Sequence, residues 1–223
     1  MAGDEPDPPN GETDSGGRLV RVGQGIVGTE TAVDRDEVEA FVAAVGSGFA
    51  DERAPLVAEA LFVAADEYPE TVAGATDALE GLAGGADPAV RGWAVAALGR
   101  VAAERPEAVA PAAGSLRWAL DDDDSTVQHN AVEALATLAE SCPDAVASAV
   151  PELRRLCAHE DVAVQHNAAG TLGLLAGVRP DAVVPAVADL RPLCDHDEQA
   201  VRRVATSALA RLAHERSGSV HSE

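Results

Sequence analysis

The stretch DSTVQHNAVEALATL at residues 124–138 reappears 37 residues later as DVAVQHNAAGTLGLL at residues 161–175. In the first copy Val127, Ala131 and Leu135 lie four residues apart. This spacing places their side chains on one face of an α-helix. The stretch therefore predicts an amphipathic helix that recurs along the chain.

The interval of 37 residues extends outward from this stretch without gaps. At several positions the residue type is the same in four successive units. These positions are Val90, Val127, Val164 and Val201; Ala94, Ala131, Ala168 and Ala205; Leu98, Leu135, Leu172 and Leu209; and Pro69, Pro106, Pro143 and Pro180. A period of this length is typical of stacked helical repeats.

Each unit is predicted to form two helices. The first follows an aspartate whose side chain accepts hydrogen bonds from the first backbone N–H groups. The capping residues are Asp87, Asp124 and Asp161, with Glu198 in the last unit. The second helix begins at the repeated proline, because proline at the first helical position loses no hydrogen bond. Later prolines predict a kink in it: Pro111, Pro151 and Pro185.

The predicted fold is an all-α solenoid, because one helix pair cannot bury its apolar face alone and stacking makes the core continuous. The repeat domain spans 34–215 and contains about four 37-residue helix pairs plus capping helices. Its parts are a cap helix at 34–46, repeats at 50–86, 87–123, 124–160 and 161–197, and a closing helix at 198–215. Residues 1–33 are acidic and rich in Pro and Gly, so we expect disorder, with a hairpin or partner-binding segment at 18–33 as the alternatives. Residues 216–223 are expected to be a flexible tail.

The composition limits the classes of partner. The 223 residues include 38 acidic and 16 basic residues, all of the latter arginine, for a net charge of −22. This charge opposes binding to nucleic acids and anionic membranes. There is neither a membrane-length apolar run nor a secretory signal, and three cysteines are too few for a disulfide framework, so we expect a cytoplasmic protein. The excess of carboxylates without lysine resembles proteins of salt-in halophiles.

Two segments carry a resemblance to a known family. DPAVRGWAVAALG at 87–99 and EQAVRRVA at 198–205 resemble HEAT repeats, especially the short subtype also found in phycobilisome lyases. The resemblance covers about residues 50–215. It implies a right-handed superhelix whose concave face is lined by the second helices. It also implies a scaffold or adaptor for protein partners, since few members are enzymes.

Four arginines on the second helices are candidates for partner binding: Arg117, Arg154, Arg155 and Arg191. They can pair with acids of neighbouring repeats, for which Asp144, Asp181 and 121–124 are candidates. Alternatively, they form a row on the concave face that docks an acidic segment of a partner through forked hydrogen bonds.

The repeated Val-Gln-His-Asn-Ala motif has two interpretations. Its polar residues are Gln128, His129, Asn130, Gln165, His166 and Asn167. They can form a polar ladder between repeats, or a weak metal site of a metal-dependent oxygenase or lyase that uses His129 and His166. Deoxyhypusine hydroxylases are HEAT-like proteins with His–Glu pairs at this place, but here asparagine replaces the anionic ligand that a di-iron centre needs.

A second periodic pair is Cys157 with His159 and Cys194 with His196. Cysteine and histidine are zinc ligands, but equivalent atoms of stacked helices lie ~8–10 Å apart. We therefore expect the cysteines to face the core.

The functional prediction is a non-catalytic protein–protein scaffold, expected to be monomeric. No catalytic residue, metal or cofactor is predicted, because the chain has no phosphate-binding loop, nucleophile elbow or His-Glu-x-x-His motif.

Overall fold

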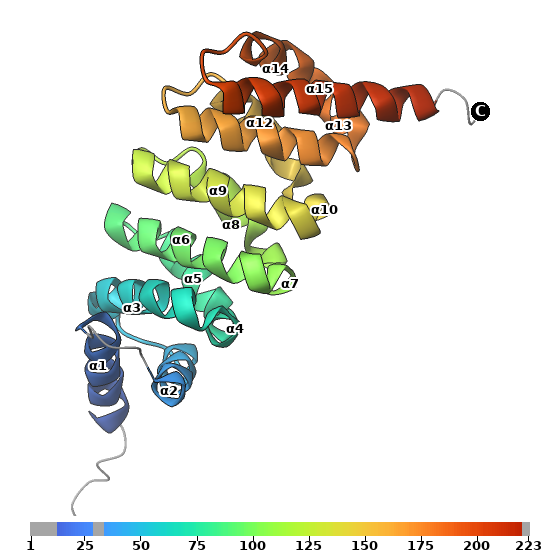
Figure 1. The fold of residues 1–223 in the computed structure, drawn as a ribbon. Coiled ribbons are helices and arrows are strands. Elements are labelled where there is room, and N and C mark those ends of the chain that lie inside the picture. Colours follow the sequence, from blue (N-terminus) through green and yellow to red (C-terminus); the bar gives the residue numbers. More distant parts are fainter. Residues whose placement is uncertain (1–12, 29–33, 220–223) are drawn as a thin grey trace, which may run out of the picture.

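The structure is a computed structural model that describes residues 13–28 and 34–219. Its regular elements are all helices, and they form two layers. One layer contains the long first helix of each unit. These are α3 (Ala54–Glu67), α6 (Pro88–Glu104), α9 (Ser125–Ser141), α12 (Val162–Ala176) and α15 (Gln199–Ser219). They stack in chain order, each packed against the next (Figure 1).

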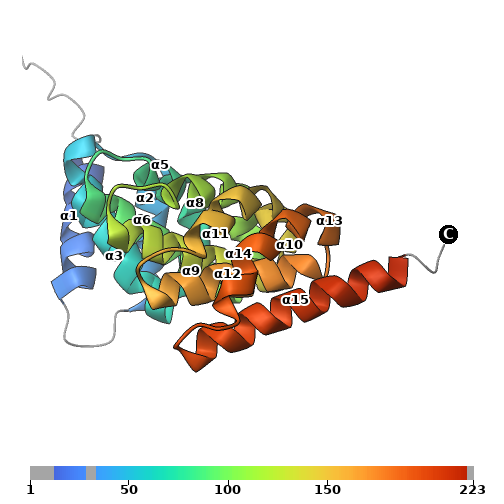
Figure 2. The ribbon, with the colours of Figure 1, turned by 90° about the horizontal axis from the view of Figure 1, so that it is seen from above.

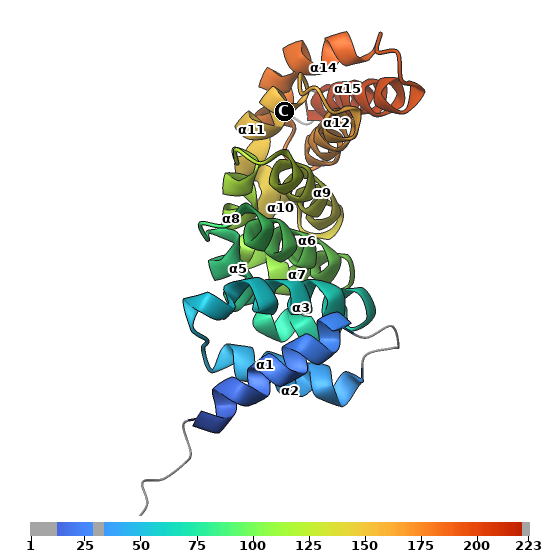
Figure 3. The ribbon, with the colours of Figure 1, turned by 90° about the vertical axis from the view of Figure 1, so that its left-hand side faces the viewer.

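The other layer contains the second helix of each unit, which is broken into two short helices. The parts before the break are α4 (Pro69–Val72), α7 (Pro106–Val109), α10 (Pro143–Val146) and α13 (Pro180–Val183). The parts after it are α5 (Thr76–Ala83), α8 (Ala113–Ala119), α11 (Val150–Leu156) and α14 (Val187–Leu193). Seen from the side, these helices lie opposite the first-helix layer (Figure 3).

The predicted kink in the second helix is confirmed, and its geometry is a single 3₁₀ turn. The turns are η2 (Ala73–Ala75), η3 (Ala110–Ala112), η4 (Ala147–Ala149) and η5 (Val184–Ala186). The turns at Ala73–Ala75 and Ala147–Ala149 contain no proline, and Pro151 lies after the break in α11, so proline is not the general cause of the turn. What the turns share is a buried final alanine, which indicates that close packing of a small side chain fixes the break.

The predicted helix caps are confirmed in three units. Asp87 Oδ1 accepts a bond from the Ala89 N–H at 2.9 Å, and Asp161 Oδ1 accepts one from Ala163 at 2.7 Å. Asp124 Oδ1 accepts bonds from the N–H groups of both Thr126 and Val127. Each carboxylate thus satisfies donors that the first helical turn leaves without a partner.

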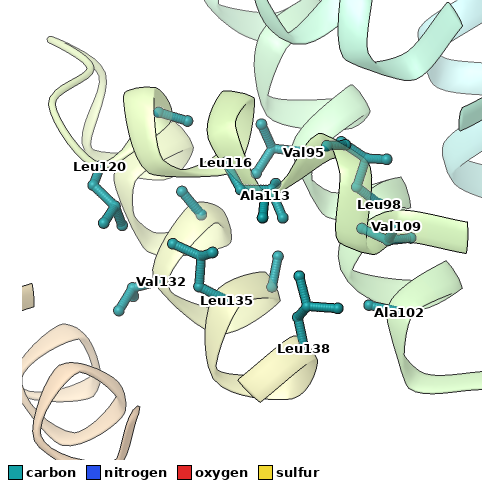
Figure 4. Packing of buried hydrophobic residues seen from close by; sticks show 14 of the residues in the cluster. Val95, Leu98, Ala102, Val109, Ala113, Leu116, Leu120, Val132, Leu135 and Leu138 are labelled. Atoms are coloured by element: carbon teal, nitrogen blue, oxygen red, sulfur yellow. The ribbon is translucent and has the colours of Figure 1, made fainter. Parts of the chain in front are cut away.

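The core lies between the two layers and is built from Leu, Val and Ala side chains. The repeated positions Leu98, Leu135 and Leu172 are fully buried. In Figure 4, Leu98 of α6, Leu116 of α8 and Leu135 of α9 converge in one continuous cluster. This arrangement explains how a chain with only 3% aromatic residues builds its core.

The prediction of disorder was wrong for residues 13–28. They form α1 (Thr13–Gly28), which packs beside α2 (Arg35–Gly46) and α3 at the end of the stack (Figure 1). Leu19 and Ile26, seven residues apart, bury against the core. A Cβ at Gly23 would lie 3.0 Å from the Phe41 ring and 3.2 Å from Leu56, so glycine permits the close crossing. Residues 1–12 and 29–33 lie outside the described residues.

The C-terminal end also differs from expectation. The helix that closes the stack continues to Ser219, so residues 216–219 are helical where a flexible tail was expected. The helix projects beyond the layer of first helices when the molecule is viewed from above (Figure 2). Residues 220–223 lie outside the described residues.

Candidate functional site

The arginines of the second helices face acids of the neighbouring units. Arg117 donates to Glu152 at 3.1 Å, and Arg154 donates to Asp189 at 2.6 Å. In both pairs the acid lies 35 residues after the arginine. Arg191 is exposed and has no ion pair within residues 13–28 and 34–219.

The fourth candidate, Arg155, pairs with Asp121 of the preceding unit. The other acids considered from the sequence are placed differently: Asp144 accepts a bond from Arg179 at 2.7 Å, and neither Asp144 nor Asp181 meets an arginine of the row. Of the four candidate arginines, Arg117, Arg154 and Arg155 are thus engaged in contacts between repeats. Trp118, beside Arg117, is 70% exposed.

The least exposed ion pair among the described residues joins helix α6 to the loop that follows α8. Arg91 of α6 donates through Nε and Nη2 to the two oxygens of Asp122, both at 2.7 Å. The exposed fractions of these side chains are only 16% and 10%. The Arg91 guanidinium holds the pKa of the Asp122 carboxyl below its ordinary value, chiefly through this hydrogen bond. Arg91 also donates to the carbonyls of Gly85 and Ala86, so it joins consecutive units.

The repeated amides and histidines make separate contacts. Asn130 donates to the Gly92 carbonyl of the preceding unit at 3.0 Å, and Gln128 Oε1 lies 3.2 Å from His159 Nε2 at the end of the same unit. His129 Nδ1 lies 3.6 Å from Asp161, whereas His166 Nδ1 lies 3.3 Å from Asn167. Gln165 Oε1 is buried without a partner in the described ranges. The described residues contain no group of three or more histidine, cysteine or acidic side chains placed to hold a metal ion.

In the two Cys–His pairs the cysteines lie at the core and the histidines lie in the loops that follow the second helices. His159 Nδ1 accepts a bond from the Asp161 N–H, and His196 Nδ1 accepts one from Glu198, each at 3.0 Å. Cys157 is buried, while Cys194 is half-buried with its thiol 3.8 Å from the Leu190 carbonyl. Burial raises the pKa of the Cys157 thiol to about 12, with a further contribution from Asp189.

Cys157 is therefore expected to resist alkylation. The thiolate is the reactive species, and a pKa of about 12 leaves almost none of it at pH 8. Iodoacetamide treatment followed by peptide mass spectrometry should label Cys142, which is half-buried, at least ~10-fold faster than Cys157. Urea should abolish the difference. Equal rates in the native protein would contradict the burial of Cys157.

A surface groove of about 1040 Å³ crosses the first-helix layer. It lies over α6 and α9, with Phe62 of α3 at one edge, and its lining residues belong to the first helices and the starts of those helices. Its floor is made of small residues. These are Gly92, Ala96, Gly99 and Ala103 of α6 and Ala134 of α9. A Cβ at Gly99 would lie 3.2 Å from Ala134 Cβ, so α6 and α9 approach closely at the floor.

Larger side chains border this floor. Trp93 is half-buried, and the Arg100 guanidinium stacks 3.7 Å above the Phe62 ring. Arg100 also donates to the Phe62 carbonyl at 2.7 Å and pairs with Asp66 at 3.0 Å. Asp87, Asp124 and Glu133 supply carboxylates. The groove therefore combines an apolar floor with a charged border, as binding sites commonly do.

Comparison with solved structures agrees with the stacked architecture. An engineered protein is 26% identical, with a TM-score of 0.71 over 92% of this chain and 93% of its own. The fold is an all-α solenoid. A designed armadillo repeat protein is 21% identical, with a TM-score of 0.69, and the match covers 92% of this chain and 95% of that protein. UNC-45 from Drosophila melanogaster is 16% identical, with a TM-score of 0.62, and the match covers 94% of this chain and 28% of that protein.

Sequence comparisons add one match. A family model for HEAT repeats matches residues 113–210 of the solenoid, and no curated protein matches the chain. None of the helices in the described ranges has the length and apolar character needed to cross a bilayer.

Sequence reasoning did not identify this groove, because its candidate surface, the row of Arg117, Arg154, Arg155 and Arg191, lies on the second helices. The missed signal is the run Gly92, Ala96, Gly99 and Ala103, a stripe of small residues at helical spacing beside Trp93. The sequence shows the stripe, but only the stacking of α6 on α9 shows that it forms the floor of a groove left open by the described part of the chain.

Proposed function

We propose that the solenoid is a non-catalytic scaffold that binds a protein partner in the groove over α6 and α9. The groove carries the proposal, because it is a concave surface with an apolar floor and polar border on a fold that generally binds proteins. The earlier candidate surface is less suitable. Arg117, Arg154 and Arg155 already pair with acids of the solenoid, and a partner would have to displace those contacts.

A groove-filling variant tests this proposal. In Ala96→Phe a large ring occupies the floor, so the partner should be lost when tagged protein is purified from its native lysate. The matched control is Gly170→Phe, at the equivalent position two repeats later, where an added Cβ has no atom of the described residues within 4 Å. This control should retain the partner, measured by quantitative mass spectrometry of the bound fraction.

A second variant tests whether the partner binds the layer of second helices instead of the groove. Trp118→Ala removes the most exposed aromatic side chain of the second-helix layer and should leave partner binding unchanged. Retention of the partner by Ala96→Phe, together with its loss from Trp118→Ala, would place the binding surface on the second helices instead. Circular dichroism should show that all three variants remain helical.

A further inference from the structure

We propose that the groove binds a cationic segment of its partner, with lysine or arginine side chains arranged around a bulky apolar one. This inference rests on the proposed function and specifies the chemistry of the partner. It follows from the charges that border the groove, from the shape of its floor and from the charge of the whole chain.

The side chains that border the groove carry more negative than positive charge. Among the described residues that line the groove the one cation is Arg100, and that guanidinium is already paired with Asp66 and stacked on Phe62. The acids are Asp87, Asp124 and Glu133. None of these three forms a salt bridge within the part of the chain that the structure describes. A ligand that neutralises them has to be positively charged.

Two of these carboxylates are held in position by the fold. Asp87 and Asp124 cap the neighbouring helices α6 and α9, so both lie at the same end of the groove. Their bonds to backbone N–H groups use Oδ1, so the second oxygen of each can accept a bond from a ligand. Glu133 lies two turns further along α9 and is exposed. A segment that follows the groove therefore meets acids at its end and along its side.

The floor selects a partner with one large apolar side chain. Ala96, Gly99 and Ala134 leave space beside Trp93 that no side chain of residues 13–28 and 34–219 fills. At 1.5 Å per residue, the lining from Pro88 to Ala103 spans ~22 Å. Together with a volume near the upper end of ordinary ligand pockets (~300–1,000 Å³), this length fits a stretch of polypeptide.

The net charge of −22 also favours a cationic partner, and its effect extends to longer range than the groove contacts. It attracts cationic segments and repels acidic ones before contact, and this effect weakens as salt increases. Such attraction is not specific to any surface, so the test must separate the groove from the overall charge.

The probes are two labelled amphipathic peptides of about 15 residues, long enough to follow the groove. One combines leucine with lysine, and its twin has glutamate in place of lysine. In fluorescence anisotropy at ~0.1 M salt, the solenoid should bind the lysine peptide at least about ten-fold more tightly than the glutamate peptide. Binding of both peptides with equal affinity, or of neither, would overturn the proposal.

Two charge reversals on α9 locate the site. Glu133→Lys at the groove should weaken binding of the lysine peptide about five-fold or more, whereas Glu140→Lys should change it less than about two-fold. Glu140 is exposed on the same helix outside the groove, and both changes alter the net charge equally. Equal effects would mean that binding is diffuse, which overturns the proposal. If Ala96→Phe releases the cellular partner while the peptides show no preference, only the cationic inference fails and the scaffold function stands.

Discussion

Leu135→Ala is expected to lower the free energy of unfolding of the solenoid by about 3–4 kcal/mol. Leu135 is fully buried where α9 meets the second helix before it, together with Leu98 and Leu116 (Figure 4). Truncation removes three carbons and leaves a cavity that the rigid helix pairs cannot close. Because the site is in the middle of the array, the loss weakens the packing of units on both sides. Urea unfolding followed by circular dichroism measures the change.

Leu209→Ala is the matched control. Leu209 is the equivalent residue of α15, but it is only half-buried because α15 is the last helix of the stack that the structure describes. Its truncation should cost about 1 kcal/mol, since much of the side chain already contacts water. Equal losses for the two variants would contradict the burial difference that the structure shows between identical positions of the repeat.

Asp122→Asn is expected to cost about 2–3 kcal/mol, because it leaves the Arg91 guanidinium largely buried without its counter-ion. Asparagine keeps the shape of the side chain, so the change reports the charge and the two hydrogen bonds. Asp121→Asn, one residue earlier in the same acidic run, should cost about 0.5 kcal/mol. Asp121 pairs with Arg155 in a contact that is 44% and 61% exposed, where water already screens the charges. Comparable losses would contradict the assignment of Asp122 as the buried link.

The pair of Arg91 and Asp122 predicts that the stability of the solenoid depends on pH. The pKa of Asp122 is lower in the folded protein than its ordinary value of about 3.9. Its stabilising effect is therefore complete above that ordinary value and is lost as the pH falls through the lower folded pKa. The difference in urea midpoint between the wild type and Asp122→Asn should be constant near neutral pH and should shrink below about pH 4. A difference that grows on acidification would show that the carboxylate is not stabilised by Arg91.

Much of the fold follows from local patterns in the chain. The positions of Val127, Ala131 and Leu135 predict the first helix of the unit, and the interval of 37 residues predicts the stack. Asp87, Asp124 and Asp161 act as caps because a side chain at that place needs only its own helix to form the bonds. The N-terminal helix was missed because its evidence is not local. Gly23 disfavours a helix by itself but is accommodated once Phe41 and Leu56 pack against it.

The helix pairs and the helix starts follow from local sequence, because each depends on residues within a few turns of one another, and the repeat is visible because residue types recur every 37 residues. The acid that each arginine meets depends on how the units stack, since Arg91 and Asp122 lie 31 residues apart and the repeat offers several acids at similar spacing. The stacking also decides where the surface is hollow. A groove is a property of two neighbouring helices, and the small side chains of α6 acquire that meaning only when α9 is stacked beside them.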